Sequence, residues 1–454
     1  MASTDNPYTR ESIAATFVRT ALPIVFLTSV NGLLTVVDAV FLGIFVGPEA
    51  LTAVTIAFPI SMFMFALAAM ISTGMASVLG RLLGANRLDD ARRIFAGAHG
   101  LSLWVSIVAM VLFAIFGWPM TMELAKSPEL ARMTHTFLSI SIYTLLLQFL
   151  LSVHANALRT EGRVGFMAIA GLLATLTNMG LNAMLIVGFG LGVAGSAWGT
   201  ALAQALALIL VVQYRLRGNA RMTFAPEDAA NWRAGWTEML ALGAPRSLLF
   251  IGGALGAAAT ILSLRLFGGP NANASIVAYG IITRIMILAY FPLLGMSLAM
   301  QAIVSNNVGA SLWARTNATL KLALILSFAY ACIVEINLIL FRHQLGGFFV
   351  TDAVVISEAA SIVPILFALY FTSGPMMMVA NYFQSIGDAR RSALLFLSRN
   401  YLFAIPLTLL LPLAVGKMGI WLALPFADAF QIIVTFAVLK ARCPQAEWGL
   451  FQSA

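Results

Sequence analysis

Apolar segments long enough to cross a lipid bilayer recur along the whole of this 454-residue chain. A helix needs about 20 apolar residues to span roughly 30 Å of hydrocarbon, and no stretch of soluble-domain size separates these segments. Hydrophobic residues make up 61% of the chain and charged residues only 10%, which is far from the composition of soluble globular domains. The sequence therefore predicts an all-α, polytopic membrane protein.

Charged residues, glycines and prolines divide the apolar segments into twelve predicted transmembrane helices. They are expected at 15–46, 50–83, 94–117, 133–158, 164–187, 196–215, 240–267, 274–308, 319–341, 355–385, 392–414 and 420–440.

The Lys and Arg residues lie mainly on alternate loops and helix ends, which indicates topology. If the N-terminus is cytoplasmic, the outer side holds only Lys126, Arg132, Arg265, Arg342 and Lys417. This positive-inside bias predicts that both termini face the cytoplasm of a bacterial cell and that the protein lies in its inner membrane. The net charge of +8 is then explained by topology, and no nucleic-acid partner is expected.

Sequence landmarks repeat between the two halves of the chain. Gly84-Ala85 recurs as Gly309-Ala310, and Gly162 recurs as Gly387. An even number of spans in each half gives repeats related by an axis along the membrane normal. We predict two six-helix lobes related by pseudo-two-fold symmetry, at 1–215 and 240–454. A cytoplasmic linker at 216–239 is expected to contain an interfacial helix, because Trp232 and Trp236 would share one helix face.

Charges well inside the spans are the first functional candidates, because placing them in a membrane is costly. Asp38 lies in the first span, Asn178 and Asn182 lie one turn apart on the fifth, and Thr200 lies just inside the sixth. These four residues are at similar depth. They are expected either to bind a proton or small cation, or to form a structural polar cluster.

Two further sets of residues stand out. Arg284 and Asp428 lie at similar depth, which predicts an intramembrane ion pair, whereas Glu335 is close enough to the outer end to extend towards water. Methionines are frequent in the second and tenth spans; they suit a cleft for varied apolar substrates or ordinary helix packing. They are Met62, Met64, Met70, Met376, Met377 and Met378.

No catalytic, cofactor or ATP-binding motif is visible. The four histidines and two cysteines have no metal-ligand spacing, and there is no phosphate-binding glycine loop or nucleophile elbow. We expect no cofactor beyond a coupling proton or sodium ion. The predicted partners are a small organic substrate and the lipid bilayer.

Several segments together resemble the multidrug and toxic compound extrusion (MATE) family. They are VDAVFLG at 37–43, RLLGA at 81–85, LRTEGR at 158–163, GFGLGVAGSAW at 188–198, AYGIITRI at 278–285 and NNVGA at 306–310. The resemblance implies two six-helix lobes and export of organic compounds, some of them cationic and amphipathic, by proton or sodium antiport. It also implies that Asp38 is the cation-site aspartate and that Asn178 and Thr200 are its partners.

The chain departs from the family pattern at Asn182, where relatives commonly have aspartate. The seventh and tenth spans also lack the acidic residues of some members. The proton load is therefore expected to rest on Asp38, and sodium binding is expected to be weakened because only one charge is available. The alternatives are a flippase of lipid-linked saccharides with a related fold, and a membrane-embedded enzyme, although no clustered catalytic residues support the latter.

Overall fold

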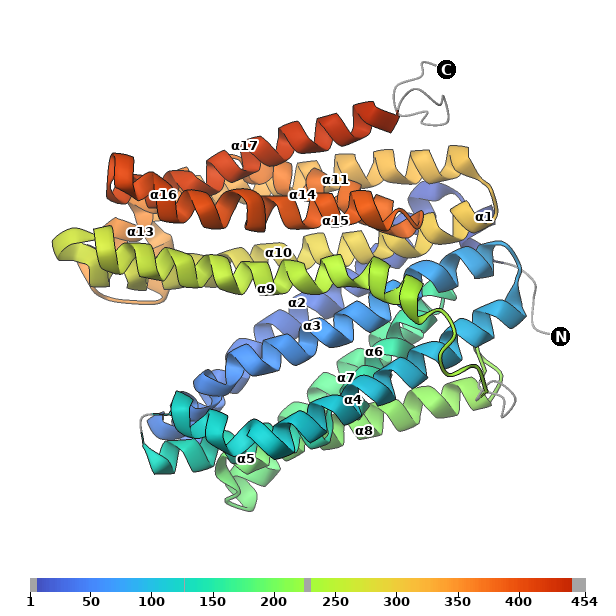
Figure 1. Ribbon diagram of the computed structural model, residues 1–454, viewed down its shortest axis with the longest axis horizontal. Helices are drawn as coiled ribbons and strands as arrows, with labels where there is room; N and C mark the ends of the chain where they lie inside the picture. The colour runs from blue at the N-terminus through green and yellow to red at the C-terminus, as the bar shows by residue number, and fades with distance from the viewer. Residues whose placement is uncertain (1–5, 126, 224–229, 443–454) are drawn as a thin grey trace. The chain divides into compact units, whose positions relative to one another are not determined.

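A computed structural model describes residues 6–125, 127–223 and 230–442; for 33–40, 42–44, 48 and 442 it describes the backbone alone. Within these residues all regular structure is helical (Figure 1). The chain divides into two compact units. Unit 1 comprises 1–11, 26–247 and 305–311, and unit 2 comprises 12–25, 248–304 and 312–454.

Ten helices are long and apolar enough to cross a membrane, and two bent helix pairs bring the number to twelve if each pair forms one span. The long helices are α2 (Ile13–Phe45), α3 (Pro48–Gly84), α4 (Leu88–Leu124), α7 (Val164–Ala183), α8 (Gly192–Leu216), α9 (Trp236–Phe267), α10 (Ala272–Gly309), α11 (Trp313–Leu340), α15 to α16 (Ala389–Leu397 and Ile405–Val415) and α17 (Lys417–Arg442). The bent pairs are α5 with α6 (Pro128–Tyr143 and Leu145–Thr160) and α13 with α14 (Ala353–Leu366 and Tyr370–Ser385). The short helices are α1 (Pro7–Arg10) and α12 (Arg342–Leu345). The prediction of an all-α, polytopic fold is confirmed.

Several helices extend beyond the apolar segments from which they were predicted. Helix α4 begins at Leu88, six residues before the predicted start, and takes in Asp89 and Asp90. Acidic side chains in a first turn are stabilised by the positive end of the helix dipole. Asp352 caps α13 in a similar way, because its Oδ1 accepts a hydrogen bond of 2.8 Å from Val354 N.

The helix boundaries repeat with a constant shift of 225 residues. Starts at 88, 128, 164 and 192 recur at 313, 353, 389 and 417. Both bent pairs are part of the repeat, with bends of 47° and 51°. Gly162 and Gly387 have φ of +83° and +90°, so a left-handed turn explains the predicted glycine repeat.

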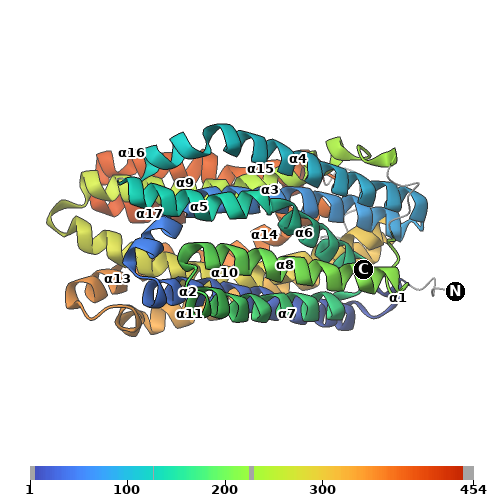
Figure 2. The ribbon, with the colours of Figure 1, turned by 90° about the horizontal axis from the view of Figure 1, so that it is seen from below.

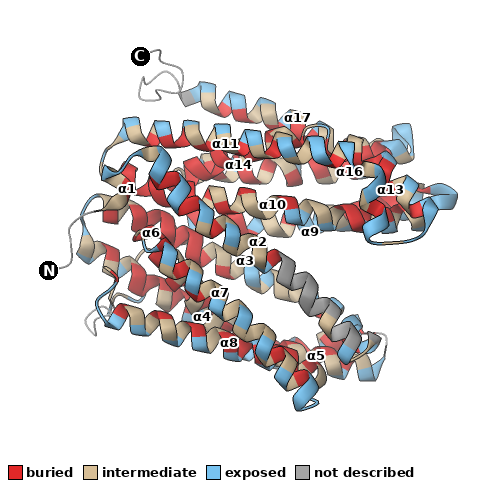
Figure 3. Cartoon of the chain, turned by 180° about the vertical axis from the view of Figure 1, so that it is seen from behind, coloured by how far each residue is buried: buried red, intermediate tan, exposed pale blue. Residues whose placement is uncertain are grey.

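In unit 1, α3 packs against α4, α5 and α6, and α8 packs against α5, α6 and α7; Figures 1 and 2 show α7 running beside α8. The end of α6 is buried and is red in Figure 3. In unit 2, α11 packs on α14, and α17 packs on α13 and α16. Large apolar side chains such as Ile336 and Leu413 remain 63% and 70% exposed, as expected of surfaces that face lipid.

The predicted interfacial linker helix is wrong in its described part. Trp236 is the first residue of α9, and Trp232 lies in the turns before it. Trp236 Nε1 donates a 2.8 Å hydrogen bond to Gly97 O on α4, and its ring meets that of Trp232 edge to face at 5.3 Å. The two tryptophans therefore attach the start of α9 to α4. Residues 224–229 lie outside the described part.

Candidate functional site

Helices α7 and α8 bring two of the predicted coupling residues together in unit 1. Asn178 Nδ2 donates a 3.0 Å hydrogen bond to Thr200 Oγ1, and Thr200 Oγ1 donates to Ser196 O one turn earlier. The amide oxygen of Asn178 is not used in this bond. The pair thus offers an amide oxygen and a hydroxyl oxygen, both of which are ligands for a hard cation.

Asn182 lies one turn further along α7 and is only 4% exposed. It packs against the backbone of Gly199 on α8: a Cβ at Gly199 would lie 2.1 Å from Asn182 Oδ1. Only glycine allows this approach without a shift. Asn178 and Asn182 therefore both face α8, one at Thr200 and the other at Gly199.

Asp38 lies in α2, but its side chain is outside the described residues. Its helix contacts α7 at two described positions. The Leu27 side chain packs on Gly171, where a Cβ would lie 2.7 Å away, and Thr175 Oγ1 donates a 2.9 Å hydrogen bond to Asn31 Oδ1. In both contacts the α7 residue number exceeds the α2 residue number by 144.

The predicted ion pair between Arg284 and Asp428 is wrong. Asp428 Oδ1 accepts a 2.5 Å hydrogen bond from Arg399 Nε instead. The physical reason is that the π-helical segment η5 (Ser398–Ala404) packs directly against α17, which carries Asp428. Arg284 is exposed on α10.

Arg399 was not predicted as a partner of Asp428. The sequence-based prediction paired Asp428 with Arg284 because the two lie at similar depth. A signal was present: Ser398, Arg399 and Asn400 form a polar run inside an apolar segment. Each of the flanking residues is buried and bonded. Ser398 Oγ donates to Gln431 Oε1 at 2.5 Å, and Asn400 Nδ2 donates to Leu249 O at 3.4 Å.

Glu335 has a specific partner in unit 2. Its Oε2 accepts a 2.7 Å hydrogen bond from Phe371 N, next to the bend between α13 and α14. The backbone amides at the start of a helix lack partners within the helix, so this carboxylate acts as a cap for α14. Glu335 is therefore a support for the bend.

The methionines differ in their surroundings. Met378 is fully buried and packs inside unit 2, whereas Met376 and Met377 on α14 are partly exposed. Met62, Met64 and Met70 on α3 are partly exposed as well. A substrate-lining role for the partly exposed methionines stays a prediction.

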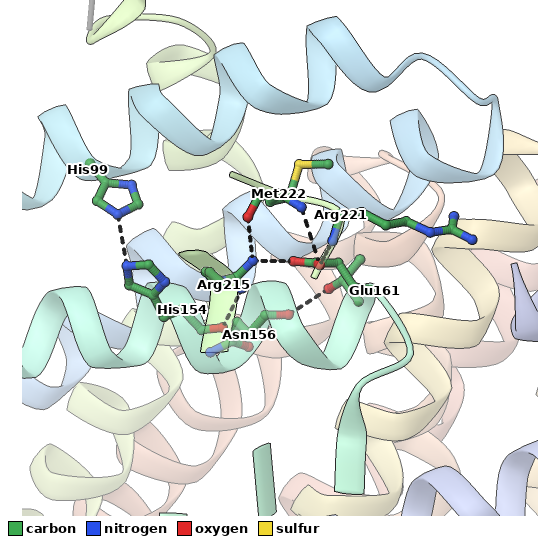
Figure 4. A network of polar contacts seen from close by, with 8 residues as sticks. His99, His154, Asn156, Glu161, Arg215, Arg221 and Met222 are labelled. Carbon is green, nitrogen blue, oxygen red and sulfur yellow. Dashed lines mark hydrogen bonds and ion pairs between the residues drawn. The ribbon is translucent and has the colours of Figure 1, made fainter. Parts of the chain in front are cut away.

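The LRTEGR segment forms a structural anchor for the end of α8 and the start of the linker (Figure 4). Glu161 Oε1 accepts a 2.6 Å bond from Arg215 Nη1, and Glu161 Oε2 accepts bonds from the backbone N–H groups of Arg221 and Met222. The Arg215 and Glu161 side chains are 4% and 0% exposed. Arg215 also donates to the carbonyls of His154 and Met222.

Other parts of unit 1 are fastened to the same segment. Tyr8 Oη donates to Arg159 O at 2.5 Å, and Asn306 Nδ2 donates to Thr160 O at 3.1 Å. These bonds give a physical reason for the appearance of Asn306 and the LRTEGR segment among the family-like motifs. Both motifs hold helix ends together.

The described residues contain no group of three or more His, Cys, Asp or Glu side chains placed to hold a metal ion. The polar side chains described above lie instead on helices that are apolar and long enough to cross a membrane. An all-helical, multi-pass architecture with a repeated set of helices and polar groups inside the spans is typical of membrane transporters.

Comparison with known proteins gives the family. A family model described as MatE matches residues 23–184 and 253–410, which together make up more than half of the chain. The chain belongs to the MatE family of multidrug efflux transporters.

Two relatives match most of the chain. The FAD transporter of Shewanella oneidensis is 24% identical over 406 residues, which is 87% of this chain and 88% of the relative. The multidrug export protein MepA of Staphylococcus haemolyticus is 23% identical over 441 residues, 96% of this chain and 95% of the relative. These relatives are transporters, in agreement with the prediction that the chain is not an enzyme.

Solved structures match the fold over its full length. One, described as the outward-facing conformation of a multidrug resistance MATE family transporter of the MOP superfamily, has a TM-score of 0.90 at 20% identity and covers 100% of both chains. A MOP superfamily transporter from Pyrococcus furiosus has the same TM-score, identity and coverage.

Proposed function

We propose that this protein is a secondary active antiporter of the bacterial inner membrane that exports a small organic compound in exchange for protons or sodium ions. Asp38 carries the coupling ion in this proposal. The distribution of Lys and Arg favours an orientation with both termini in the cytoplasm.

The observation that carries the proposal is the constant register between α2 and α7. Leu27 meets Gly171 and Asn31 meets Thr175, and the same offset of 144 pairs residue 38 with Asn182. Residue 38 lies two helical turns beyond Asn31, about 10 Å further along the helix and on the same face. This register supports a site in which Asp38 faces the amides of α7, close to Asn178 and Thr200.

The composition of this site favours protons over sodium. A carboxylate at membrane depth with only neutral partners is stabilised by taking up a proton. A cation bound there would have one negatively charged ligand, because Asn182 stands where relatives commonly have aspartate. Binding of the proton and of the exported compound then favours different states, which is what coupling requires.

The class of exported compound has two precedents among the relatives, since one is named a FAD transporter and another a multidrug export protein. The sequence-based expectation of an amphipathic, cationic compound fits the second name. A lipid-linked saccharide flippase remains the alternative, and flux of such a lipid with no dependence on an ion gradient would favour it.

The test is transport of a fluorescent organic cation such as ethidium in proteoliposomes under imposed proton or sodium gradients. We expect a proton gradient to drive flux in the wild type and Asp38→Asn to abolish the gradient dependence. Asp89→Asn is the matched control, because Asp89 is 89% exposed and its ion pair with Arg92 is loose at 3.7 Å. Unchanged gradient-driven flux in Asp38→Asn would contradict the proposal.

Asn182→Asp tests the choice of ion. The change adds a second carboxylate beside the position of Asp38, so flux should gain dependence on a sodium gradient. If Asn182→Asp shows no sodium dependence, the missing carboxylate does not explain the preference for protons.

A further inference from the structure

The guanidinium of Arg399 in unit 2 is only partly used. Its Nε donates to Asp428 Oδ1 at 2.5 Å, and its Nη1 donates to Asn400 Oδ1 at the long distance of 3.4 Å. A guanidinium has five N–H donors. Within the described residues no other acceptor is bonded to it, so its terminal nitrogens retain free donors.

The Arg399 side chain is partly accessible. The Arg399 side chain is 29% exposed, whereas that of Asp428 is 5% exposed. Tyr279 and Tyr370 lie within electrostatic range of Arg399, and both are buried, at 6% and 8% exposure. Two buried tyrosines of unit 2 therefore lie near the guanidinium.

Tyr370 adds a second, independent sign of an incomplete site. Its hydroxyl is buried, and no hydrogen-bond partner for it lies among the described residues. A buried hydroxyl without a partner is unfavourable. The neighbouring Tyr330 differs, because its hydroxyl donates a 3.1 Å bond to Ala289 O.

The backbone is irregular where these side chains start. Arg399 belongs to the π-helical segment η5, and Tyr370 is the first residue of α14, after the 51° bend. Single π-helical turns and broken transmembrane helices occur frequently at binding sites. Two irregular segments thus bring an unsaturated cation and an unpaired hydroxyl into one region.

We propose that Arg399 and Tyr370 form a substrate site that binds an anionic oxygen group, a carboxylate or a phosphate, carried by an aromatic compound. This proposal rests on the proposed function, since it names the substrate class of the exporter. The Nη1 and Nη2 edge of Arg399 donates to the anion, and the Tyr370 hydroxyl supplies a further donor. Asp428 holds the guanidinium in place through Nε.

The negative charge of Asp428 next to Arg399 predicts a change in anion affinity that a purely structural pair would not show. Asp428 lies beside the incoming anion and repels it. Asp428→Asn keeps an acceptor for Nε but removes this negative charge, so anion binding should become tighter. A pair that served stability alone would give no gain in binding when it is weakened.

The test compares riboflavin with flavin mononucleotide, which have the same planar ring and differ by one phosphate. Equilibrium binding to the detergent-purified full-length protein is measured by the change in flavin fluorescence, without any ion gradient. Charge-assisted hydrogen bonds to the phosphate should make the mononucleotide bind about 10- to 100-fold more tightly. Arg399→Gln should remove this difference, and Asp428→Asn should increase it.

Two further variants separate binding from folding. Tyr370→Phe removes the hydroxyl without changing the ring, so it should weaken the mononucleotide selectively while riboflavin binding stays constant. Arg265→Gln is the control, because Arg265 is an exposed arginine in the last turn of α9 of the same unit. It should leave both affinities unchanged.

The proposal is overturned if wild type binds the two flavins equally, if the preference for phosphate survives Arg399→Gln, or if ethidium binds and neither flavin does. Failure of the proposed function is seen separately, as loss of gradient dependence in the flux assay. A protein that binds the mononucleotide through Arg399 but shows no ion-driven flux of ethidium or of the mononucleotide retains this site and disproves antiport.

Discussion

Within its described residues each unit contains a buried carboxylate that pairs with an arginine, Glu161 in unit 1 and Asp428 in unit 2, and the two pairs are built differently. In unit 1, Arg215 and Glu161 are almost completely enclosed, and both side chains have further backbone partners. In unit 2, Arg399 and Asp428 share one bond, and the arginine remains 29% exposed. An enclosed pair with several further partners holds the fold together, whereas an open pair with few partners can exchange them.

The repeat extends this contrast to the polar sites. With the shift of 225 residues, Arg399 and Asp428 correspond to Ala174 and Ala203, while Asn178 and Thr200 correspond to Phe403 and Pro425. The helix boundaries were kept in both halves, but neither site has a polar equivalent in the other half. A common scaffold thus carries two chemically different sites.

The largest predicted effect is a loss of stability when the enclosed pair of Arg215 and Glu161 is broken. Glu161→Gln leaves the Arg215 charge buried without its counterion, which should destabilise the protein by about 3–5 kcal/mol. Thermal unfolding in detergent micelles measures the loss. Glu238→Gln is the control, because Glu238 pairs with Arg81 at 49% exposure and should cost about 1 kcal/mol or less. Equal losses would remove the contrast between enclosed and open pairs.

The contact between α7 and α8 should respond next most strongly. Gly199→Ala places a Cβ 2.1 Å from Asn182 Oδ1, so the helices must separate, at a cost of about 1–3 kcal/mol. The same variant should impair proton-driven flux because it displaces Asn182. Gly188→Ala is a suitable control, since a Cβ there meets no atom within 4 Å. Normal stability of Gly199→Ala would show that this contact is looser than described.

The open pair of Arg399 and Asp428 should tolerate neutralisation of its carboxylate. Asp428→Asn retains a hydrogen-bond acceptor, and Arg399 is partly exposed, so the expected loss is about 1 kcal/mol. The same unfolding measurement puts it directly beside Glu161→Gln. A loss as large as that of Glu161→Gln would mean that both pairs are structural and would weaken the case for a substrate site.

The smallest effect on stability is expected for Tyr370→Phe. The Tyr370 hydroxyl is buried without a partner, so its removal should be neutral or stabilise the protein by about 1 kcal/mol. Tyr8→Phe is the contrasting variant, because its hydroxyl donates to Arg159 O and its loss should be destabilising. If Tyr370→Phe is the more destabilising of the two, the hydroxyl is bonded after all.

The fold was predictable from the sequence because apolar length and periodicity act locally. The twelve segments and their repeat needed no knowledge of contacts. The bends before Leu145 and Tyr370 were not predicted, since the apolar runs continue through them. Asp89 and Asp90 were excluded from α4 as polar residues, although the helix dipole accommodates them.

The sites were less predictable because pairing depends on which helices touch. Similar depth suggested Arg284 for Asp428, yet the packing of η5 on α17 brings Arg399 there. The proximity of Asn178 and Thr200 was predictable, because α7 and α8 are consecutive helices that pack against each other. The position of the Asp38 side chain stays a prediction.

The linker is held to Glu161 through main-chain amides at 221 and 222, and this has an evolutionary consequence. The two bonds to the Glu161 carboxylate use no side chain there, so they require only an N–H at each position, although Met222 is also fully buried and needs an apolar side chain. Proline is the one residue type without that group. Related exporters should therefore avoid proline at both positions and keep an apolar residue at 222.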